Sequence, residues 1–530
     1  MRSRNILAAH NILNKSIHMI GGKQLDNVSI KLKNITKTFG QTFANKNINF
    51  DVHGGEILAL LGENGSGKTT LMNILAGIYK PDSGEIFVNG KNVAINSPED
   101  ALKLGIGMIH QHFKLVENYT AADNIILGSK QSFFLKKERK DEVRRLSEKY
   151  KLDINPDKKI YDMSVSEKQT VEILKVLYRG ANILILDEPT AVLTPQETKK
   201  LFDILRNMKQ AGCAIVIITH KLAEVKEISD RVTVLRKGEC VASAKTSEKD
   251  VKGLAELMVG KSLEFSIDRP KRNYSGKLLE IYRLTVKDNE GVTALHDVTF
   301  NLHAGEILGV AGVAGSGQKQ LCEAIAGLTP VSEGAILHKK VNIVGKSPQE
   351  IIDLGISMSF IPEDRLGMGL AGSMGIMDNM LLKDYSKGKS PFLNKKDAKK
   401  RANELVSELK IYTPDIYTPV KTLSGGNVQK VLLGREIGSQ PNVLITAYPV
   451  RGLDINSSYL IYDLLNEQKQ KGTAVLFIGE DLDVMLELCD RIMVLCHGEI
   501  TGILKAGEAT KEKIGLMMTA AEKKEEPEDE

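Results

Sequence analysis

A short glycine-rich segment at residues 62–69, G-E-N-G-S-G-K-T, has the spacing of a phosphate-binding loop. Its glycines allow consecutive backbone N–H groups to turn inward around phosphate oxygens, and the N-terminus of a following helix adds partial positive charge. Lys68 is expected to reach the β and γ phosphates of a nucleotide, and the Thr69 hydroxyl is expected to hold Mg²⁺. The residues predicted to contact the nucleotide are Gly62, Asn64, Gly65, Ser66, Gly67, Lys68, Thr69 and Thr70.

Two adjacent carboxylates, Asp187 and Glu188, follow the apolar run I-L-I-L. Such a run is typical of a buried strand in a parallel sheet, and ligands bind at the carboxyl ends of these strands. Asp187 suits the coordination shell of Mg²⁺, and Glu188 suits the polarisation of an attacking water. A surface Asp-Glu pair that starts a turn is the alternative, and the phosphate-binding loop earlier in the chain argues against it.

A second glycine-rich segment, G-V-A-G-S-G-Q-K at residues 312–319, repeats the spacing of the first without its charged residue. Gln318 stands in place of the lysine, and Ala447 and Tyr448 in I-T-A-Y-P stand in place of the two carboxylates. Loss of one charge-assisted contact costs roughly 1.5 to 3 kcal/mol, and loss of a positioned base costs about 10² to 10⁴ in rate. We therefore expect no hydrolysis here, although backbone donors for weak nucleotide binding remain at Gly312, Gly315 and Gly317.

The duplication extends well beyond the loops and divides the chain into two homologous domains. F-D-V-H-G-G-E-I-L at residues 50–58 matches F-N-L-H-A-G-E-I-L at residues 300–308, and S-D-R-V-T-V-L matches C-D-R-I-M-V-L. Equivalent positions such as Phe50 and Phe300 lie 250 residues apart, and a repeat of this length indicates two domains and not a solenoid. We predict an N-terminal extension at 1–28, a first copy at 29–260, a linker at 261–277, a second copy at 278–518 and an acidic tail at 519–530.

Each copy is predicted to be an α/β domain built on a mainly parallel sheet with flanking helices. Short β-branched and Leu-rich runs alternate with segments of helical period, as in sheets covered by helices. Strands are expected at 56–61, 183–188 and 214–220, and a helix is expected at 69–76. More polar, helical inserts are expected at about 112–162 and about 364–421.

The bulk composition is that of a globular protein without a nucleic-acid surface. The 530 residues are 42% hydrophobic and 26% charged, and the formal net charge is only +5. The five cysteines form no C-x-x-C pair and no zinc spacing, which favours a reduced cytoplasmic chain. The longest apolar runs have the length of strands, so we expect any membrane to be spanned by another chain.

The chain resembles ATP-binding-cassette ATPases, with two cassettes fused, over nearly its whole length. The resemblance implies ATP and Mg²⁺ as cofactors. It implies that Phe39 in T-K-T-F-G stacks on adenine, the alternative being a core aromatic. It also implies that Gln111 in M-I-H-Q-H-F senses the γ-phosphate and Mg²⁺ and contacts a membrane partner, and that His220 in I-I-T-H-K is the switch histidine. The catalytic residues would then be Glu188, His220, Lys68 and Gln111, and the metal-binding residues would be Thr69, Gln111 and Asp187.

The family's signature loop, L-S-G-G-Q, is altered in the first copy and kept in the second. Residues 163–167 read M-S-V-S-E and Thr194 replaces the D-loop aspartate, whereas residues 423–427 read L-S-G-G-N. Cassettes of this family pair head to tail, which implies that the first phosphate loop faces the second signature. The implied partners of the first loop are Ser424, Gly425, Gly426, Asn427 and Asp454. The other site would be silent, with Glu480 in place of the switch histidine and Glu363 in place of the glutamine.

Fused pairs with this asymmetry are similar to the ATPase subunits of bacterial monosaccharide and nucleoside importers. The phrase L-S-G-G-N-V-Q-K resembles this group, and A-Y-P-V-R-G-L-D together with the G-S-G-Q loop most resembles its branch that works with purine-nucleoside-binding lipoproteins. This implies a peripheral protein at the cytoplasmic face of the membrane, two transmembrane permease subunits, an extracytoplasmic solute-binding lipoprotein and no nucleic acid. The alternatives are a soluble fused-cassette ATPase acting on ribosomes or DNA, and a regulatory ATPase without a transport role.

Overall fold

The computed structural model describes residues 28–40, 42–110, 113–128, 136–191, 193–219, 221–260, 267–271, 276–288, 290–313, 315–360, 365–382, 395–451 and 453–519.

The first copy contains a small antiparallel sheet and a larger, mainly parallel sheet. The small sheet has the strand order β2-β1-β4-β5 and the large one the order β10-β9-β3-β8-β7-β6, in which only β9 and β10 pair antiparallel. The small sheet consists of β1 (Val28–Phe39), β2 (Thr42–His53), β4 (Ser83–Val88) and β5 (Lys91–Val93). The large sheet consists of β3 (Ile57–Leu61), β6 (Ile106–Ile109), β7 (Ile183–Asp187), β8 (Ala214–Ile218), β9 (Arg231–Arg236) and β10 (Glu239–Lys245).

The second copy repeats both sheets with the same connectivity. Their orders are β12-β11-β14-β15 and β16-β17-β18-β13-β19-β20. The small sheet consists of β11 (Lys277–Lys287), β12 (Thr293–His303), β14 (Val331–His338) and β15 (Val341–Asn342). The large sheet consists of β13 (Ile307–Ala311), β16 (Ile356–Phe360), β17 (Val443–Ala447), β18 (Ala474–Ile478), β19 (Arg491–Cys496) and β20 (Glu499–Lys505). The predicted fold class, including an antiparallel part in each copy, is confirmed.

Helices cover the large sheets and build the inserts. The first copy has α2 (Lys68–Leu75), α3 (Pro98–Lys103), α4 (Ala121–Ile126), α5 (Lys136–Tyr150), η1 (Ile160–Asp162), α6 (Val165–Tyr178), α7 (Pro195–Gln210), α8 (Leu222–Ile228), η2 (Thr246–Glu248) and α9 (Val251–Val259). The second copy has α10 (Gln318–Ile325), α11 (Pro348–Asp353), α12 (Arg365–Met368), α13 (Ile376–Leu381), α14 (Lys395–Glu408), η3 (Val420–Thr422), α15 (Gly425–Gly438), α16 (Ile455–Gln470), α17 (Leu482–Leu488), η4 (Ala506–Glu508) and α18 (Lys511–Met518). Within the described residues, α4, α5 and η1 form the first insert, and α12, α13, α14 and η3 form the second.

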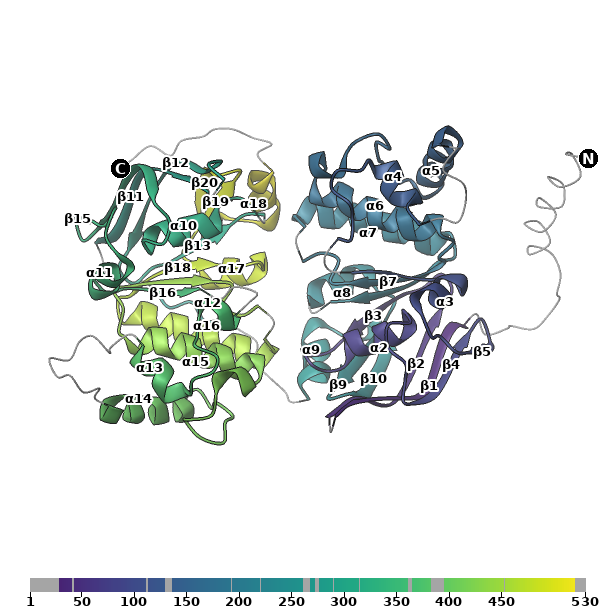
Figure 1. Cartoon of the computed structure of the whole chain (residues 1–530), viewed down its shortest axis with the longest axis horizontal. Coiled ribbons are helices and arrows are strands. Elements are labelled where there is room, and N and C mark those ends of the chain that lie inside the picture. The colour runs from purple at the N-terminus through teal and green to yellow at the C-terminus, as the bar shows by residue number, and fades with distance from the viewer. Residues whose placement is uncertain are drawn as a thin grey trace, which may run out of the picture.

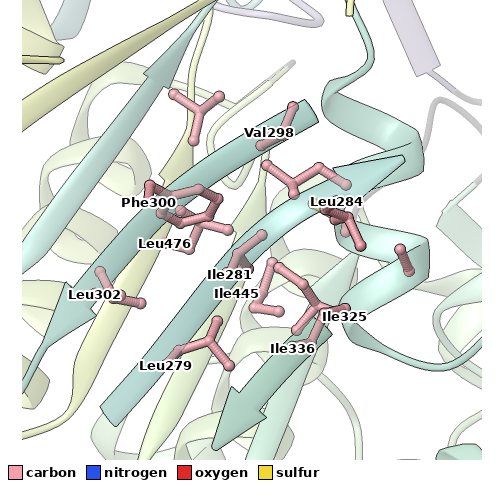
Figure 2. Close-up of a cluster of buried hydrophobic side chains, with 14 of the residues drawn as sticks. Leu279, Ile281, Leu284, Val298, Phe300, Leu302, Ile325, Ile336, Ile445 and Leu476 are labelled. Carbon is pink, nitrogen blue, oxygen red and sulfur yellow. The ribbon is translucent and has the colours of Figure 1, made fainter. Parts of the chain in front are cut away.

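The central strands are buried because both faces of each large sheet are covered. All five residues of β3 and of β13 are buried, as expected of parallel strands that read as unbroken apolar runs. In the second copy, the small sheet packs over the large one. Figure 2 shows side chains of β11 and β12, including Ile281 and Phe300, gathered with Ile445 of β17 and Leu476 of β18.

The two copies lie side by side (Figure 1), and α18 of the second copy approaches α7 of the first. The N-terminal end of α7 meets α18 of the second copy, where Gln196 Nε2 donates to the Glu512 carbonyl at 3.1 Å. A Cβ on Gly515 of α18 would lie 2.9 Å from Pro195 Cδ, so this glycine permits the close approach. On the other side, Ile455 at the start of α16 packs on an apolar cluster of the first copy. The second copy therefore contacts the first at two equivalent places.

The core between the two sheets of the second copy provides a test of this packing. Ile281 is 0% exposed, and Ile281→Ala removes its buried methylenes and leaves a cavity. We expect a loss of about 2 to 5 kcal/mol in the opening free energy of the second copy, measured by hydrogen exchange of peptides from β11 and β12. Val292→Ala is the control, because Val292 is 60% exposed. Equal effects of the two substitutions would contradict the packing.

Candidate nucleotide-binding site

The first phosphate-binding loop connects β3 to α2 and curls at two glycines that other residues cannot replace. Gly62 has φ 152° and Gly67 has φ 98°. A Cβ on Gly62 would lie 2.3 Å from the Leu235 carbonyl oxygen, and one on Gly67 would lie 2.2 Å from that of Ala44. The loop therefore needs glycine for its conformation and for its close approach to neighbouring backbone.

Lys68 points back into this loop. Its ammonium donates to the carbonyls of Gly62 at 2.7 Å and of Glu63 at 2.9 Å, and the side chain is only 8% exposed. Burial lowers the Lys68 pKa, whereas Glu188, Asp187 and Glu63 act to raise it. The ammonium is therefore held inside the curl that would surround phosphate oxygens.

The two predicted carboxylates emerge beside the loop because β7 runs parallel to β8, which in turn runs parallel to β3. Burial and the neighbouring Glu188 charge raise the Asp187 pKa to about 6, against the lowering effect of Lys68. Glu188 has φ 46°, a left-handed conformation that is uncommon for residues other than glycine. Its backbone N–H donates to the Ile218 carbonyl at 2.9 Å, which fixes this turn at the edge of the sheet.

The first copy carries oxygen groups of the kinds that bind Mg²⁺ and phosphate. Thr69 lies in the first turn of α2, and an oxygen-rich set including Asp187 suits Mg²⁺. Ser66 is 3% exposed, and its buried Oγ makes no hydrogen bond within the protein. A buried hydroxyl without a partner inside a phosphate-binding curl fits a ligand with oxygen acceptors. Gly65 and Thr70 complete the curl and the first turn of α2.

Phe39 ends β1 and presents an aromatic surface. It is 48% exposed and meets Tyr79 edge-on at 5.4 Å between ring centroids. Phe39 is therefore not a core aromatic, and one of its faces can receive a flat ring such as a nucleobase.

The second copy reaches the first phosphate loop through its D-loop. Asn64 Nδ2 donates to the Leu453 carbonyl at 3.2 Å. Burial, and after it the charge of Asp454, raises the Glu63 pKa. Asp454 also caps α16 by accepting from the Ser457 backbone N–H at 2.9 Å. The D-loop segment of the second copy therefore contacts the phosphate loop of the first.

The two signature segments differ at their helix N-termini. In the first copy, Ser164 and Glu167 form a capping box on α6, and Lys158 pairs with Glu167 at 2.8 Å. In the second copy, Ser424 caps α15 without a side-chain hydrogen bond to the backbone, and Gly425 and Gly426 follow it. Thus the first helix start carries its own carboxylate, which disfavours an anion, whereas the second is open to one.

Asn427, the last residue of the second signature, is held locally. Its Nδ2 donates to Ser424 Oγ at 2.9 Å, and its Oδ1 accepts from the Tyr412 backbone N–H at 3.1 Å. This pairing fixes the signature loop to the chain that follows α14.

The second phosphate loop keeps the left-handed conformation of its last two glycines but changes its chemistry. Gly315 and Gly317 have φ values of 88° and 101°, whereas Gly312 lies outside the left-handed region. Gln318 takes the place of Lys68 and donates from Nε2 to the Val313 carbonyl at 3.3 Å. Tyr448 has φ 52° and donates its N–H to the Ile478 carbonyl at 2.8 Å, as Glu188 does to Ile218. Ala447 is buried at the end of β17.

Three predicted residues, Gln111, His220 and Glu363, lie outside the described residues, so their roles remain predictions. Two contributions were absent from the sequence interpretation. Glu167 was recognised only as a departure from the signature, although the spacing S-V-S-E already indicates a capping box. Arg451, whose guanidinium pairs with Glu480 at 3.2 Å, had no local signal.

Within the described ranges, no helix combines the length and the apolar character that crossing a membrane requires.

Comparisons with known proteins agree with this geometry. The family described as ABC transporter matches residues 45–191 and again residues 295–449. The guanosine import ATP-binding protein NupO of Bacillus subtilis (strain 168) is 44% identical, covering 94% of this chain and 98% of that protein. The nucleoside import ATP-binding protein NupA of Lactococcus lactis subsp. cremoris (strain MG1363) is 42% identical, covering 92% and 97%. The ribose import ATP-binding protein RbsA 1 of Rubrobacter xylanophilus is 38% identical, covering 93% and 98%.

The raised Asp187 pKa of about 6 makes the stability of the nucleotide-free protein depend on pH. The folded state binds this proton more tightly than the unfolded state, so the free energy of unfolding falls as the pH rises through about 4 to 6. Asp187→Asn should therefore raise it at pH 8 by about 1 to 2 kcal/mol, allowing for solvent screening of this partly exposed group, and by less at pH 5.

Chemical denaturation at both pH values measures this effect, with Asp203→Asn as the control because Asp203 is exposed on α7. In wild-type protein, ATP with Mg²⁺ should raise the free energy of unfolding more than ATP with a chelator does. Asp187→Asn should lose this difference. An equal increase in the free energy of unfolding of Asp187→Asn at pH 5 and pH 8 would be evidence against the raised Asp187 pKa as its cause.

Proposed function

The chain belongs to the ABC transporter family and is an ATP-hydrolysing transporter subunit, and from this we propose its function. It energises import of a nucleoside through one hydrolytic site that both copies build. The carrying observation is the contact of Asn64, in the complete phosphate loop, with the Leu453 carbonyl of the other copy. It supports a site assembled from the first loop and the second signature and D-loop segments. The second copy thus completes the active site.

Within this site, the first copy binds the phosphates and orients the water. Lys68 leaves the loop carbonyls and donates to the β and γ phosphates, while the backbone N–H groups of the loop hold their oxygens. Glu188 accepts a hydrogen bond from the attacking water and aligns it. Thr69 and Asp187, with Gln111, would hold Mg²⁺, which would supply positive charge to neutralise the β and γ phosphates. His220 contacts the γ-phosphate, and Phe39 stacks on adenine.

The second copy completes the site from the opposite side. The open N-terminus of α15, with Ser424, Gly425, Gly426 and Asn427, faces the γ-phosphate and supplies donors and partial positive charge. Closure then depends on ATP, because these donors gain a phosphate partner only when the copies meet. The remaining site pairs Gln318, Ala447 and Tyr448 with the self-capped α6 and does not hydrolyse ATP.

A nucleoside is proposed as the solute on the basis of the relatives. The two nucleoside importers are 44% and 42% identical to the chain, and the ribose importer is 38% identical. The ATPase subunit does not contact the solute, so selection belongs to an extracytoplasmic solute-binding lipoprotein.

Two transmembrane permease subunits are the proposed partners, and the protein sits against them at the cytoplasmic face of the membrane. The inserts carry exposed apolar side chains at equivalent places, Tyr119 and Leu127 beside α4 and Met374 and Leu382 beside α13. Exposed apolar side chains that recur on both copies fit a pair of similar partners. No nucleic acid is proposed as a partner.

The half-site assignment is tested by substitutions at equivalent positions, measuring ATP turnover of the complex with its membrane subunits. Lys68→Ala and Ser424→Arg should each lower turnover at least about a hundredfold, because one removes a phosphate contact and the other blocks the opposing helix start.

Ser164→Arg, the matched change in the first copy, should retain most of the turnover, and Gln318→Lys should not raise it, because Ala447 and Tyr448 remain. A doubled rate in Gln318→Lys, or normal turnover in Ser424→Arg, would refute the assignment.

The solute assignment is tested in proteoliposomes that contain the complex and its solute-binding protein. Guanosine uptake driven by internal ATP should exceed ribose uptake by at least about tenfold, because a site built to hydrogen-bond a base rejects a solute without one. Ribose uptake without guanosine uptake would show that the proposed solute class is wrong.

A further inference from the structure

The D-loop segments of the two copies are held by different side chains. In the first copy, Thr190 Oγ1 donates to Glu224 at 2.6 Å, and Lys221 Nζ donates to the Thr190 carbonyl at 3.1 Å. Lys221 and Glu224 also pair at 3.2 Å. The equivalent residues of the second copy are Val450, Val484 and Asp481, which cannot form this set.

The second copy has a different anchor, made from residues at positions where the first copy has other chemistry. Arg451 Nε pairs with Glu480 Oε1 at 3.2 Å, and its guanidinium carbon lies 5.8 Å from the centre of the Tyr448 ring. Tyr448 stands at the position of Glu188, and Glu480 stands at that of His220. We call this set the Tyr448–Arg451–Glu480 bridge.

The bridge leads directly to the part of the second copy that meets the first phosphate loop. Arg451 N–H donates to the Tyr448 carbonyl at 3.2 Å, and Leu453 N–H donates to the Val450 carbonyl at 3.0 Å. The Leu453 carbonyl then accepts from Asn64 at 3.2 Å. Arg451, which pairs with Glu480, and Leu453, which contacts the loop around Lys68, thus lie two residues apart on one turn of the backbone.

A second tether holds the same segment to the signature helix. Gln429 of α15 is fully buried and donates from Nε2 to the Pro449 carbonyl. Gln169 of α6 makes the equivalent bond to Pro189 at 2.9 Å, so this tether is common to both copies. The bridge, by contrast, belongs to the second copy, whose D-loop faces the complete phosphate loop.

We propose that the Tyr448–Arg451–Glu480 bridge positions the D-loop of the second copy for ATP hydrolysis at the first phosphate loop. Arg451 and Glu480 are positioning residues in this inference, because they act through Leu453 and Asp454. The inference rests on the proposed assignment of hydrolysis to the first half-site. It gives the altered residues of the second half-site a role in the turnover of the other site.

The expected effect is moderate. The Arg451 and Glu480 side chains are 30% and 37% exposed, so water competes for their pairing. Loss of the pair should leave the D-loop in its working position for only part of the time, and small displacements of positioning groups lower rates strongly. We expect a fall in kcat of about three- to tenfold, with the KM for ATP unchanged because the phosphate loop is intact.

The test uses the full complex with its membrane subunits and four variants. Arg451→Ala and Glu480→Gln each break the pair, and the double variant Arg451→Glu/Glu480→Arg restores it with the charges exchanged. Arg283→Ala is the control, because Arg283 and Asp297 form an exposed pair at 2.9 Å in the small sheet of the second copy. The measurements are kcat, KM for ATP and the unfolding temperature.

Three results together support the inference. Both single variants lose kcat while the KM for ATP and the unfolding temperature stay constant. The double variant has a higher kcat than either single variant, and Arg283→Ala matches the wild type. The inference is overturned if the single variants keep wild-type kcat, if the exchanged pair gives no recovery, or if kcat falls only together with the unfolding temperature. A raised KM in place of a lowered kcat would also overturn it, because it would make Arg451 a nucleotide contact.

Lys68→Ala in the same preparation separates the two claims. If this variant retains turnover, the assignment of hydrolysis to the first half-site fails. If it is inactive while Arg451→Ala and Glu480→Gln turn over normally, only the role of the bridge fails.

Discussion

The parallel pairing of β3, β8 and β7 is the constraint on which the site depends. Strands that run parallel in neighbouring positions end at one edge, so the segments that follow them meet there. The pairing brings Asp187 and Glu188 close to Lys68, although Lys68 is far from them in the sequence. The three groups then affect each other's charge. Burial disfavours the charges of Lys68 and Asp187, and the attraction between them offsets this cost only in part, so the strand pairing is what holds the groups together.

The division of labour between the copies follows from what each offers at a helix start. Any helix N-terminus attracts an anion, but a carboxylate placed there already occupies the available donors. Glu167 does this on α6, whereas the two glycines after Ser424 leave α15 without a carboxylate in its first turn. The change at the helix start therefore affects the first copy, whereas the loss of the loop lysine and of the two carboxylates affects the second. In the proposed pairing, one site keeps all its donors and the other loses them from both sides.

Much of the fold could be predicted because its signals are local. The apolar runs of β3, β7 and β8 each lie within a single strand, and the glycine spacing alone predicts the conformation of the phosphate-binding loop. The helical inserts were expected from polarity and period, and helices occupy their described parts. Arg451 could not be recognised in this way, because its pairing with Glu480 depends on how β17 and β18 end side by side. Gln111 and His220 remain predictions from the motif alone.

The second copy shows that a turn can lose its carboxylate and keep its backbone conformation. Tyr448 keeps the left-handed conformation of Glu188, with φ 52° against 46°, and the equivalent hydrogen bond to the neighbouring strand. A strained conformation persists only where the surroundings hold it. Here the turn leads directly into the D-loop, whose Leu453 carbonyl contacts Asn64 of the other copy. Retaining the turn without its carboxylate agrees with the proposed task of this segment, which is to position the D-loop at the neighbouring site.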